Sequence, residues 1–444
     1  MFSVYINSND RDLANNSFSY RVMSLLAVVY LLLFPLSSTV LPHISGVIVT
    51  FIVFSSVFLY FFSNNEHQRF NRDERLFCFS VGAMLVVAIL ATIVSGVNAV
   101  GMGKLGKFIY LLMVIPVFYY FRVIRVRSDW IWYGLVIGSI ASALVGIYEV
   151  VNDVYKPGYL GRAKGATHPI IFGDLALIMG AMALAGWGWF KAQANWQVVL
   201  PVAALGSGVL ASMLSQSRGG WIAVPFLISI FIWYISAYTS KMKMAIGILL
   251  IMGLFFVAYQ VPQTGMEYRA NTTVDNIRTY MNADNKSVIV GTSVSSRFEM
   301  WKASWNIFIE HPVLGVGWGK YQENVIEQAE QGKRVLLEGN LDPGNFNHPH
   351  NQFLSALASG GVVGFIAVIL LFLIPARFFY KACKSAEYNA EVRRLALAGL
   401  VFVVGFAIFN LSESFLERSR TVSFFVFYLA VFMAGIRGQK EVIS

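Results

Sequence analysis

The chain alternates between long apolar runs and shorter polar segments. Apolar runs of about 17 to 25 residues are long enough to cross a bilayer as helices. Runs that approach or reach this length lie at residues 22–40, 45–63, 76–99, 108–121, 130–150, 169–190, 198–214, 220–237, 244–262, 352–375, 395–411 and 421–436. The pattern therefore predicts an all-α, polytopic membrane protein with about 12 transmembrane helices.

Basic residues mark alternate short loops. They follow the second, fourth, eighth and tenth runs: Arg69, Arg72, Arg75, Arg122, Arg125, Arg127, Lys241, Lys243, Arg377, Lys381, Lys384, Arg393 and Arg394. Short loops rich in lysine and arginine stay in the cytoplasm. We therefore expect both termini in the cytoplasm, with residues 152–168, 215–221, 263–350 and 413–420 on the opposite, outer face of the membrane.

The longest polar segment divides the chain into three parts. Residues 1–262 hold the first nine predicted spans, residues 263–350 form a large outer loop, and residues 351–444 hold the last three spans. The loop is long enough to be a small extramembrane domain, and it contains helical patterns of its own.

The first of these patterns begins at Ser296 and Glu299, which have the spacing of a capping box. Aromatic residues then recur at helical spacing, so we expect an amphipathic helix from Arg297 to about Glu310, with its aromatic face on the membrane surface. A second helix is expected over residues 321–331, and residues 341–347 are expected to form the loop that returns to the membrane.

Composition narrows the class of protein further. Of the 444 residues, 57% are hydrophobic and 13% are charged, against about 25% charged in soluble domains. The net charge of +10 suits loops beside anionic lipid and a phosphate-bearing substrate. Nothing indicates a nucleic-acid module, a nucleotide fingerprint or a zinc motif, so we expect no cofactor and no metal. The two cysteines predict no disulfide framework.

A histidine pair lies where the long polar segment meets the tenth run. Pro349 suits the first position of a helix, which makes His348 the expected cap and places His350 in the first turn. The positive end of the helix dipole disfavours an imidazolium there. A neutral histidine accepts a proton, as a general base must. The alternative is an interfacial histidine that anchors the membrane helix.

Arginines are predicted on the same outer face. Arg218 lies in a tight glycine-rich turn, and Arg297 lies at an expected helix N-terminus, where free amides also bind anions. Arg162 and Lys164 lie in the loop before the sixth run. Guanidinium groups are always charged and bind phosphate through two donors at once. We expect a cationic face beside His350, while snorkelling toward lipid headgroups is the alternative for each cation.

Carboxylates also occur near this face. Asp174 falls inside the sixth run and Glu149 near the outer end of the fifth. Ionisable groups within membrane spans are functional candidates, although Asp174 could instead pair with an arginine or histidine across the bundle. Glu413 and Glu417 are candidates for orienting an arginine or a histidine, but a solvated turn is the simpler interpretation.

A family resemblance brings these residues together. His350-Asn351, nine residues, Gly361, two residues and Gly364 resemble the motif of the bacterial O-antigen ligase and polymerase superfamily. Further matching motifs are Ser217-Arg218-Gly219, Ser296-Arg297 with its tryptophan-rich helix, and Pro312-Val313-Leu314-Gly315-Val316-Gly317. The resemblance covers roughly residues 200–365, and the layout of about twelve spans fits the rest.

The resemblance implies a type C glycosyltransferase-like membrane fold with a helical periplasmic loop domain. The implied reaction moves O-antigen polysaccharide from undecaprenyl diphosphate to a sugar hydroxyl of the lipid A core. It takes place at the periplasmic face of the bacterial inner membrane, without metal, and inverts the anomeric carbon.

The resemblance also implies roles for particular residues. His350 is similar to the essential histidine of the family, which deprotonates the acceptor, and Arg218 and Arg297 match arginines that bind the diphosphate. The remaining substrate-binding candidates are Arg162, His348, Asn351 and Asp174, whereas His168 and Glu413 are less firmly placed. Because His348 lies beside His350, the sequence leaves open which histidine is the base.

Three other functions remain open. An O-antigen polymerase uses the same donor but accepts a second lipid-linked glycan. A protein O-oligosaccharyltransferase shares the histidine motif, although it usually carries a larger outer domain near its end. A transporter would gather polar residues near the membrane midplane on broken, repeated helices, whereas the polar residues here are predicted at the outer rim.

Overall fold

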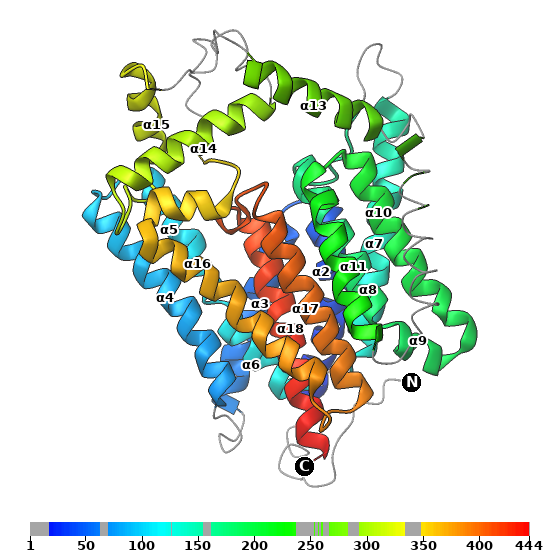
Figure 1. Ribbon diagram of the computed structural model, residues 1–444. Helices are drawn as coiled ribbons and strands as arrows, with labels where there is room; N and C mark the ends of the chain where they lie inside the picture. Colours follow the sequence, from blue (N-terminus) through cyan, green and yellow to red (C-terminus); the bar gives the residue numbers. More distant parts are fainter. Residues whose placement is uncertain are drawn as a thin grey trace.

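The structure is a computed structural model of a bundle of helices (Figure 1). It describes residues 17–62, 70–125, 127–153, 161–236, 253, 256, 259–260, 266–282, 293–333 and 348–443. Within these ranges the regular elements are helices, and no strand occurs. This confirms the predicted all-α class.

The helices before the predicted loop are α2 (Ser17–Thr39), α3 (Ile44–Phe62), α4 (Arg72–Val94), α5 (Ala99–Leu111), α6 (Val114–Ile124), α7 (Asp129–Asp153), α8 (Pro169–Ala185), α9 (Trp187–Gln193), η2 (Asn195–Val198), α10 (Val199–Ser215) and α11 (Arg218–Ser236). The loop segment holds α13 (Met266–Asn282), α14 (Ser293–Glu310) and α15 (Tyr321–Glu330). The last part holds α16 (Gln352–Lys384), α17 (Ala390–Phe409), η6 (Phe415–Glu417) and α18 (Ser419–Ile443).

The described residues contain 10 helices that are long and apolar enough to span a membrane, or 11 when α8 and α9, which meet at a bend of 53°, count as one span. These helices follow the order of the predicted runs, so the polytopic membrane fold is confirmed. The ninth predicted run, residues 244–262, lies almost entirely outside the described residues.

The fourth span is longer than the sequence predicted. It extends from Ala99 to Ile124 as α5 and α6, whereas the apolar run begins only at residue 108. Asn98 starts the helix, because its side chain accepts a hydrogen bond from the N–H of Gly101 (2.7 Å). Glycines and lysines in the first turns lowered the apolar signal, and this part of the span was therefore missed.

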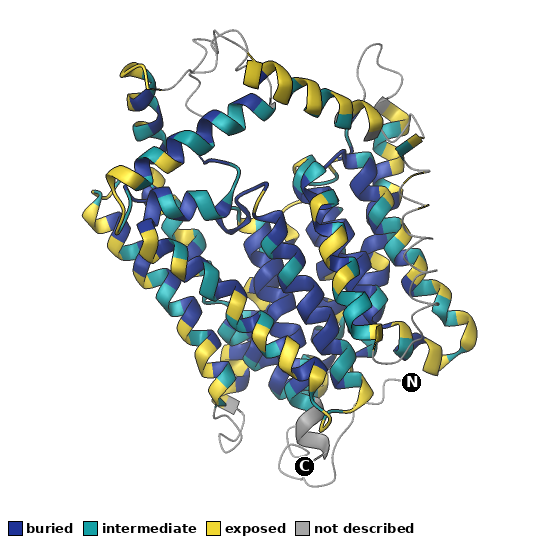
Figure 2. Ribbon diagram, in the orientation of Figure 1, coloured by how far each residue is buried: buried dark blue, intermediate teal, exposed yellow. Residues whose placement is uncertain are grey.

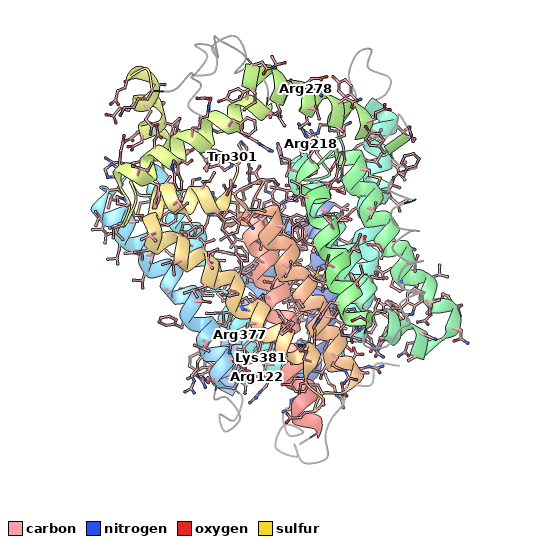
Figure 3. All side chains as sticks on the ribbon, viewed as in Figure 1. Arg122, Arg218, Arg278, Trp301, Arg377 and Lys381 are labelled. Carbon is pink, nitrogen blue, oxygen red and sulfur yellow. The ribbon has the colours of Figure 1, made fainter. Side chains whose placement is uncertain are left out.

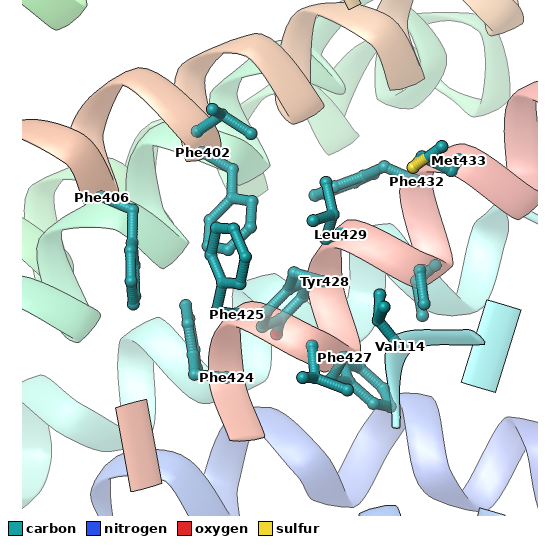
Figure 4. Packing of buried hydrophobic residues seen from close by; sticks show 14 of the residues in the cluster. Val114, Phe402, Phe406, Phe424, Phe425, Phe427, Tyr428, Leu429, Phe432 and Met433 are labelled. Carbon is teal, nitrogen blue, oxygen red and sulfur yellow. The ribbon is translucent and has the colours of Figure 1, made fainter. Parts of the chain in front are cut away.

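Helices α17 and α18 form the centre of the bundle. Of the most apolar 18-residue stretch of each, 78% and 89% of the residues are buried (Figure 2). Aromatic rings fill the space between them, with Phe402 and Phe406 of α17 against Phe425 of α18 (Figure 4). Helices within a membrane are held mainly by van der Waals packing of this kind, because lipid tails are as apolar as the side chains.

Helices α13 to α15 lie across one end of the bundle (Figure 1). Helix α15 confirms the helix predicted over residues 321–331, whereas helix α13 was not predicted. The loop predicted at residues 341–347 lies outside the described residues. The predicted start of α14 was wrong, because the helix already includes Ser293 and Ser296 is therefore not its cap.

The buried side of α14 is not its aromatic side. Met300, Ala303 and Ile307 form a small core with residues of the following loop and α15, while Trp305 is 50% exposed. The expected contact of the aromatic side with the bilayer stays a prediction.

A break at Gly361 joins the loop after α14 to the start of α16. Gly361 has φ 61° and ψ −159°, and a Cβ there would lie 2.2 Å from the carbonyl oxygen of Val313. Four backbone hydrogen bonds span the junction: Val316 to Ala358 (3.0 Å), Gly317 to Ser359 (2.9 Å), Val362 to Pro312 (2.8 Å) and Val363 to Val313 (3.4 Å). The motif glycine therefore allows the segment 312–317 to pack closely against the first part of α16.

Basic residues occupy both ends of the bundle. Arg122, Arg377 and Lys381 lie at the end far from α13 and α14, whereas Arg218 lies directly below α13 (Figure 3). The first group belongs to the loops predicted to be cytoplasmic, so Arg218 lies at the end predicted to be periplasmic.

Candidate active site

The histidine segment ends immediately before α16. Asn351 is the N-cap, and its Oδ1 accepts hydrogen bonds from the N–H groups of Phe353 (3.0 Å) and Leu354 (3.1 Å). The expectation that His348 caps the helix and that His350 lies in its first turn was wrong. His350 instead has φ 49°, a left-handed conformation that non-glycine residues seldom adopt and that is often found at functional sites.

Glu413 lies within hydrogen-bonding distance of both histidines. Its Oε2 lies 3.0 Å from Nδ1 of His350, and its Oε1 lies 3.0 Å from Nε2 of His348. Nη2 of Arg418 lies 3.2 Å from the same Oε1. The side chain of Glu413 is fully buried, so the expectation of a solvated turn was wrong. The loop between α17 and α18 is therefore part of the histidine site.

The charge of Glu413 determines which ring nitrogen of each histidine carries the proton and which one keeps an available lone pair. Burial alone would raise the pKa of this carboxyl, but hydrogen bonds from His348 and His350 and the charges of His350 and Arg418 hold its pKa well below the usual range. An ionised carboxylate accepts from both rings, so His350 donates through Nδ1 and His348 through Nε2. The lone pair of His350 is then on Nε2.

The two histidines differ in how open they are. The His350 side chain is 25% exposed and the His348 side chain 9% exposed. Nδ1 of His348 is buried and has no hydrogen-bond partner among the described residues. Burial lowers the pKa of His350 and outweighs Glu413, whose hydrogen bond and charge raise it. His350 is therefore neutral near pH 7 and is the histidine with the better access to a substrate.

A second carboxylate supports this loop. Glu417 is buried, forms an ion pair with Lys104 of α5 and accepts a hydrogen bond from Ser355 of α16. Oε1 of Gln352 accepts from the N–H of Leu416 (3.1 Å). The loop that carries Glu413 is therefore attached to α5 and to the first turn of α16, which limits the movement of the histidine site.

Arg218 begins α11, and Asp174 of α8 holds the turn before it. Oδ1 of Asp174, a fully buried residue, accepts a hydrogen bond from Oγ of Ser217 (2.6 Å). A Cβ on Gly220 would lie 2.8 Å from the same oxygen, which explains the small residue there. Nη1 of Arg218 donates to Oγ1 of Thr273 in α13. Asp174 is thus a support of the arginine turn rather than a partner of an arginine or histidine through a hydrogen bond.

Arg297 lies in α14, and its guanidinium is affected by the charges of two carboxylates. Burial lowers its pKa, whereas the charges of Glu413 and Asp174 raise it, which places the guanidinium in the field of both. Because α14 begins at Ser293, the expected free amides at Arg297 are absent. One turn later, Nε1 of Trp301 donates to the carbonyl of Pro349 (3.0 Å), so α14 contacts the histidine segment directly.

The loop before α8 completes the site. Nε of Arg162 donates to the carbonyl of Ser215 (3.0 Å), and His168 is the N-cap of α8. Partial burial lowers the pKa of His168 to about 4, helped by the charges of Arg418 and Arg162. Glu149 accepts hydrogen bonds from the N–H groups of Lys164 (2.8 Å) and Gly165 (2.9 Å), which gives it a structural role in this loop.

The histidine site also has the residue types of a metal centre. Ligand atoms of His348, His350 and Glu413 lie within 4.8 Å of one another. A metal ion would have to replace both histidine hydrogen bonds and remain close to the Arg418 guanidinium, which repels it. These contacts favour a hydrogen-bonded triad, and the absence of a metal stays a prediction.

The sequence did not identify the roles of two residues of the histidine site, Glu413 and Arg418. Glu413 is separated from His350 by 63 residues, and Arg418 follows five residues after Glu413. The short turn between the last two spans has no motif spacing that links it to the histidines. The available signal was a cluster of two carboxylates and two arginines between apolar runs.

Comparison with known proteins identifies the family of this region. Residues 202–369 match the model of the O-antigen ligase family. An uncharacterized protein of Haemophilus influenzae is 24% identical over 366 residues, 81% of this chain and 86% of that protein. A ComP-specific O-oligosaccharyltransferase of Acinetobacter baylyi is 26% identical over 206 residues, 46% of this chain and 32% of that enzyme. The match of residues 202–369 to the O-antigen ligase family confirms the resemblance read from the motifs of this region.

Proposed function

We propose that the protein is an O-antigen ligase. It transfers polysaccharide from undecaprenyl diphosphate to a sugar hydroxyl of the lipid A core, at the periplasmic face of the inner membrane. The observation that carries the proposal is the free Nε2 of His350, which Glu413 orients through Nδ1. The matched family and the arginines on α11 and α14 support a lipid-linked glycan as the donor.

The reaction needs one proton transfer and one displacement. Nε2 of His350 takes the proton of the acceptor hydroxyl, and the oxygen attacks the anomeric carbon from the face opposite the diphosphate. The bond between the anomeric carbon and the diphosphate oxygen breaks, and its electron pair stays on the diphosphate. Arg218 and Arg297 stabilise that negative charge. A single displacement inverts the anomeric configuration.

Glu413 makes His350 a stronger base, because its negative charge stabilises the imidazolium that forms. His348 fixes the other oxygen of the same carboxylate and is a positioning residue. We assign the base role to His350, since its free nitrogen belongs to the more exposed ring.

The proposal is tested with purified protein, undecaprenyl-diphosphate-linked glycan and lipid A core in the presence of EDTA. We expect glycan on the core, with the inverted anomeric configuration by NMR. Lengthening of the lipid-linked glycan with a bare core would identify a polymerase. Absence of any transfer while the lipid-linked glycan crosses the membrane of proteoliposomes would point to a transporter.

A protein acceptor is the second candidate, because the matched relative from Acinetobacter baylyi is an O-oligosaccharyltransferase. The same assay distinguishes it when ComP, the protein named for that relative, replaces the lipid A core. Transfer to the protein and none to the core would overturn the ligase assignment.

A further inference from the structure

Helix α5 carries two lysines in the half of its span near η6. Lys104 forms an ion pair with Glu417, whose carboxylate also accepts a hydrogen bond from Ser355. Lys107 lies one turn further along α5, and among the described residues no partner forms a hydrogen bond or ion pair with its ammonium. The charges of two cations, Lys104 and Arg418, act on Lys107 together with that of Glu417, which is already paired with Lys104.

This ammonium lies at an unfavourable depth for a charge without a counter-ion. Lys107 is the ninth residue of α5, which places it about 12 Å along the helix from its outer end at 1.5 Å per residue. Charged groups in membrane spans are costly and usually mark a substrate or ion site. An anion brought by a ligand would balance Lys107.

Arg418 connects this position to the histidine site. Its Nη2 lies 3.2 Å from Oε1 of Glu413 and 3.2 Å from Nε2 of His348, and a third of its side chain is exposed. Lys107 and Arg418 together are called the α5 cation pair below. Arg418 is the member of the pair that contacts Glu413, the carboxylate that orients His350.

The surface of α5 next to Lys107 is open. Gly103 is one turn before Lys107 on the same face of the helix, and Gly106 is its neighbour in the chain. A Cβ built on either glycine would meet no atom within 4 Å. A ligand group can therefore approach the backbone beside Lys107 without displacing a side chain.

The α5 cation pair is separate from the arginines assigned to the donor. Helix α5 lies beside α4 on one side of α17 and α18, and α11 lies on the other side (Figure 1). Helix α5 packs on α4, α18 and η6, whereas α11 packs on α8 and α17. Arg218 therefore approaches the histidine site from a different side than Lys107.

We infer that the α5 cation pair is a second anion subsite, which binds a phosphate group of the acceptor glycolipid. The inference rests on the proposed transferase function. The donor diphosphate is assigned to Arg218 and Arg297, and the acceptor hydroxyl must reach His350, which Arg418 adjoins through Glu413. Ammonium and guanidinium groups form strong, charge-assisted hydrogen bonds with phosphate.

The test compares Lys107→Gln with Lys333→Gln in the purified transfer assay. Lys333 is an exposed lysine paired with Glu310 and remote from the histidine site, so its variant is the control for loss of one positive charge. Each variant receives lipid A core with its phosphates and the same core after phosphatase treatment. We expect Lys107→Gln to raise the KM for the phosphorylated acceptor about tenfold, as expected from one lost charge-assisted contact. The KM for the dephosphorylated acceptor and the KM for the donor stay unchanged.

A second pair of variants tests access without changing charge. Gly103→Leu places a side chain beside Lys107, and Gly82→Leu on α4 is the control, because a Cβ on Gly82 also meets no atom within 4 Å. We expect Gly103→Leu to raise the KM for the phosphorylated acceptor and Gly82→Leu to leave it unchanged.

Several results would overturn the inference. An equal effect of Lys107→Gln on both acceptors would make Lys107 a structural residue, and a raised donor KM would place it on the donor side. A wild-type rate that depends on anionic phospholipid in the vesicles, and not on acceptor phosphate, would assign the pair to a lipid headgroup. If the wild-type protein transfers glycan to neither acceptor, the ligase proposal fails instead.

Discussion

Glu413 fixes the direction in which His350 presents its free nitrogen. The buried Glu413 carboxylate accepts hydrogen bonds from two histidines, an arginine and the N–H of Ser414. Removing it affects both the orientation and the basicity of His350. The histidine motif could be predicted from the sequence, because its residues are close along the chain. Glu413 could not be assigned, because an isolated glutamate in a short turn has no local feature that indicates burial.

We expect Glu413→Gln to lower kcat roughly 10- to 100-fold, a part of the 10²–10⁴ that a positioned base contributes. The carboxylate raises the pKa of His350 while burial lowers it, so removal of the carboxylate lowers the pKa further. The acid limb of the pH–rate profile should therefore move to lower pH. A profile that keeps its acid limb would show that Glu413 does not act on the base.

At the scale of elements, the helices are positioned by contacts that cannot be predicted from the pattern of apolar residues. Helix α15 was predicted within one residue, because its apolar residues Tyr321, Val325 and Ala329 recur at helical spacing. The first turns of α5 were missed, since their glycines and lysines do not resemble a membrane span. The sequence showed Gly361 only as a glycine of the motif and did not predict the break in α16. The structure shows that the segment 312–317 packs against this break.

Gly361→Ala should destabilise the junction between α16 and the segment 312–317. Alanine at φ 61° is strained, and its Cβ would collide with the carbonyl of Val313. We expect a loss on the order of 1–3 kcal/mol in the free energy of unfolding, seen as a lower Tm in detergent. Gly82→Ala is the matched control, because it meets no atom. Equal Tm values for the two variants would contradict this account of the break.

Helix α13 contributes Thr273 to the arginine site. Thr273→Val removes the acceptor for Nη1 of Arg218, and the neighbouring Thr272→Val removes a hydroxyl that bonds only within the helix, to the carbonyl of Tyr268. A hydrogen bond to a charged group contributes about 1.5–3 kcal/mol. We expect Thr273→Val to raise the donor KM about tenfold and Thr272→Val to leave it unchanged. The reverse order of effects would exclude Thr273 as the residue that orients Arg218.

For the whole molecule, the asymmetry of basic residues predicts its orientation. Arg377 and Lys381 lie at the end opposite Arg218 (Figure 3), as the charges of the short loops predicted. The pattern of long apolar runs was enough to predict the class of fold, because a membrane span is recognised by its length and apolarity alone. The packing of α17 and α18 at the centre depends on which faces meet, and the apolar pattern is equally strong on all faces.

The predicted orientation can be measured by cysteine labelling. In a chain with Cys78 and Cys383 replaced by serine, we expect Lys333→Cys to react with a membrane-impermeant maleimide in intact spheroplasts. Lys384→Cys should react only after permeabilisation. Labelling of Lys384→Cys in intact spheroplasts would reverse the orientation and place the histidine site in the cytoplasm.

The central claim is that His350, oriented by Glu413, is the base of a glycan transfer. The most direct measurement is the single-turnover rate of transfer to lipid A core for wild type, His350→Ala and His348→Ala. We predict that His350→Ala lowers this rate about 10²- to 10⁴-fold, the contribution of a positioned base. His348→Ala should retain most of the rate, because Arg418 still holds the shared oxygen of Glu413. Near-normal transfer by His350→Ala, with loss of transfer in His348→Ala, would contradict the account.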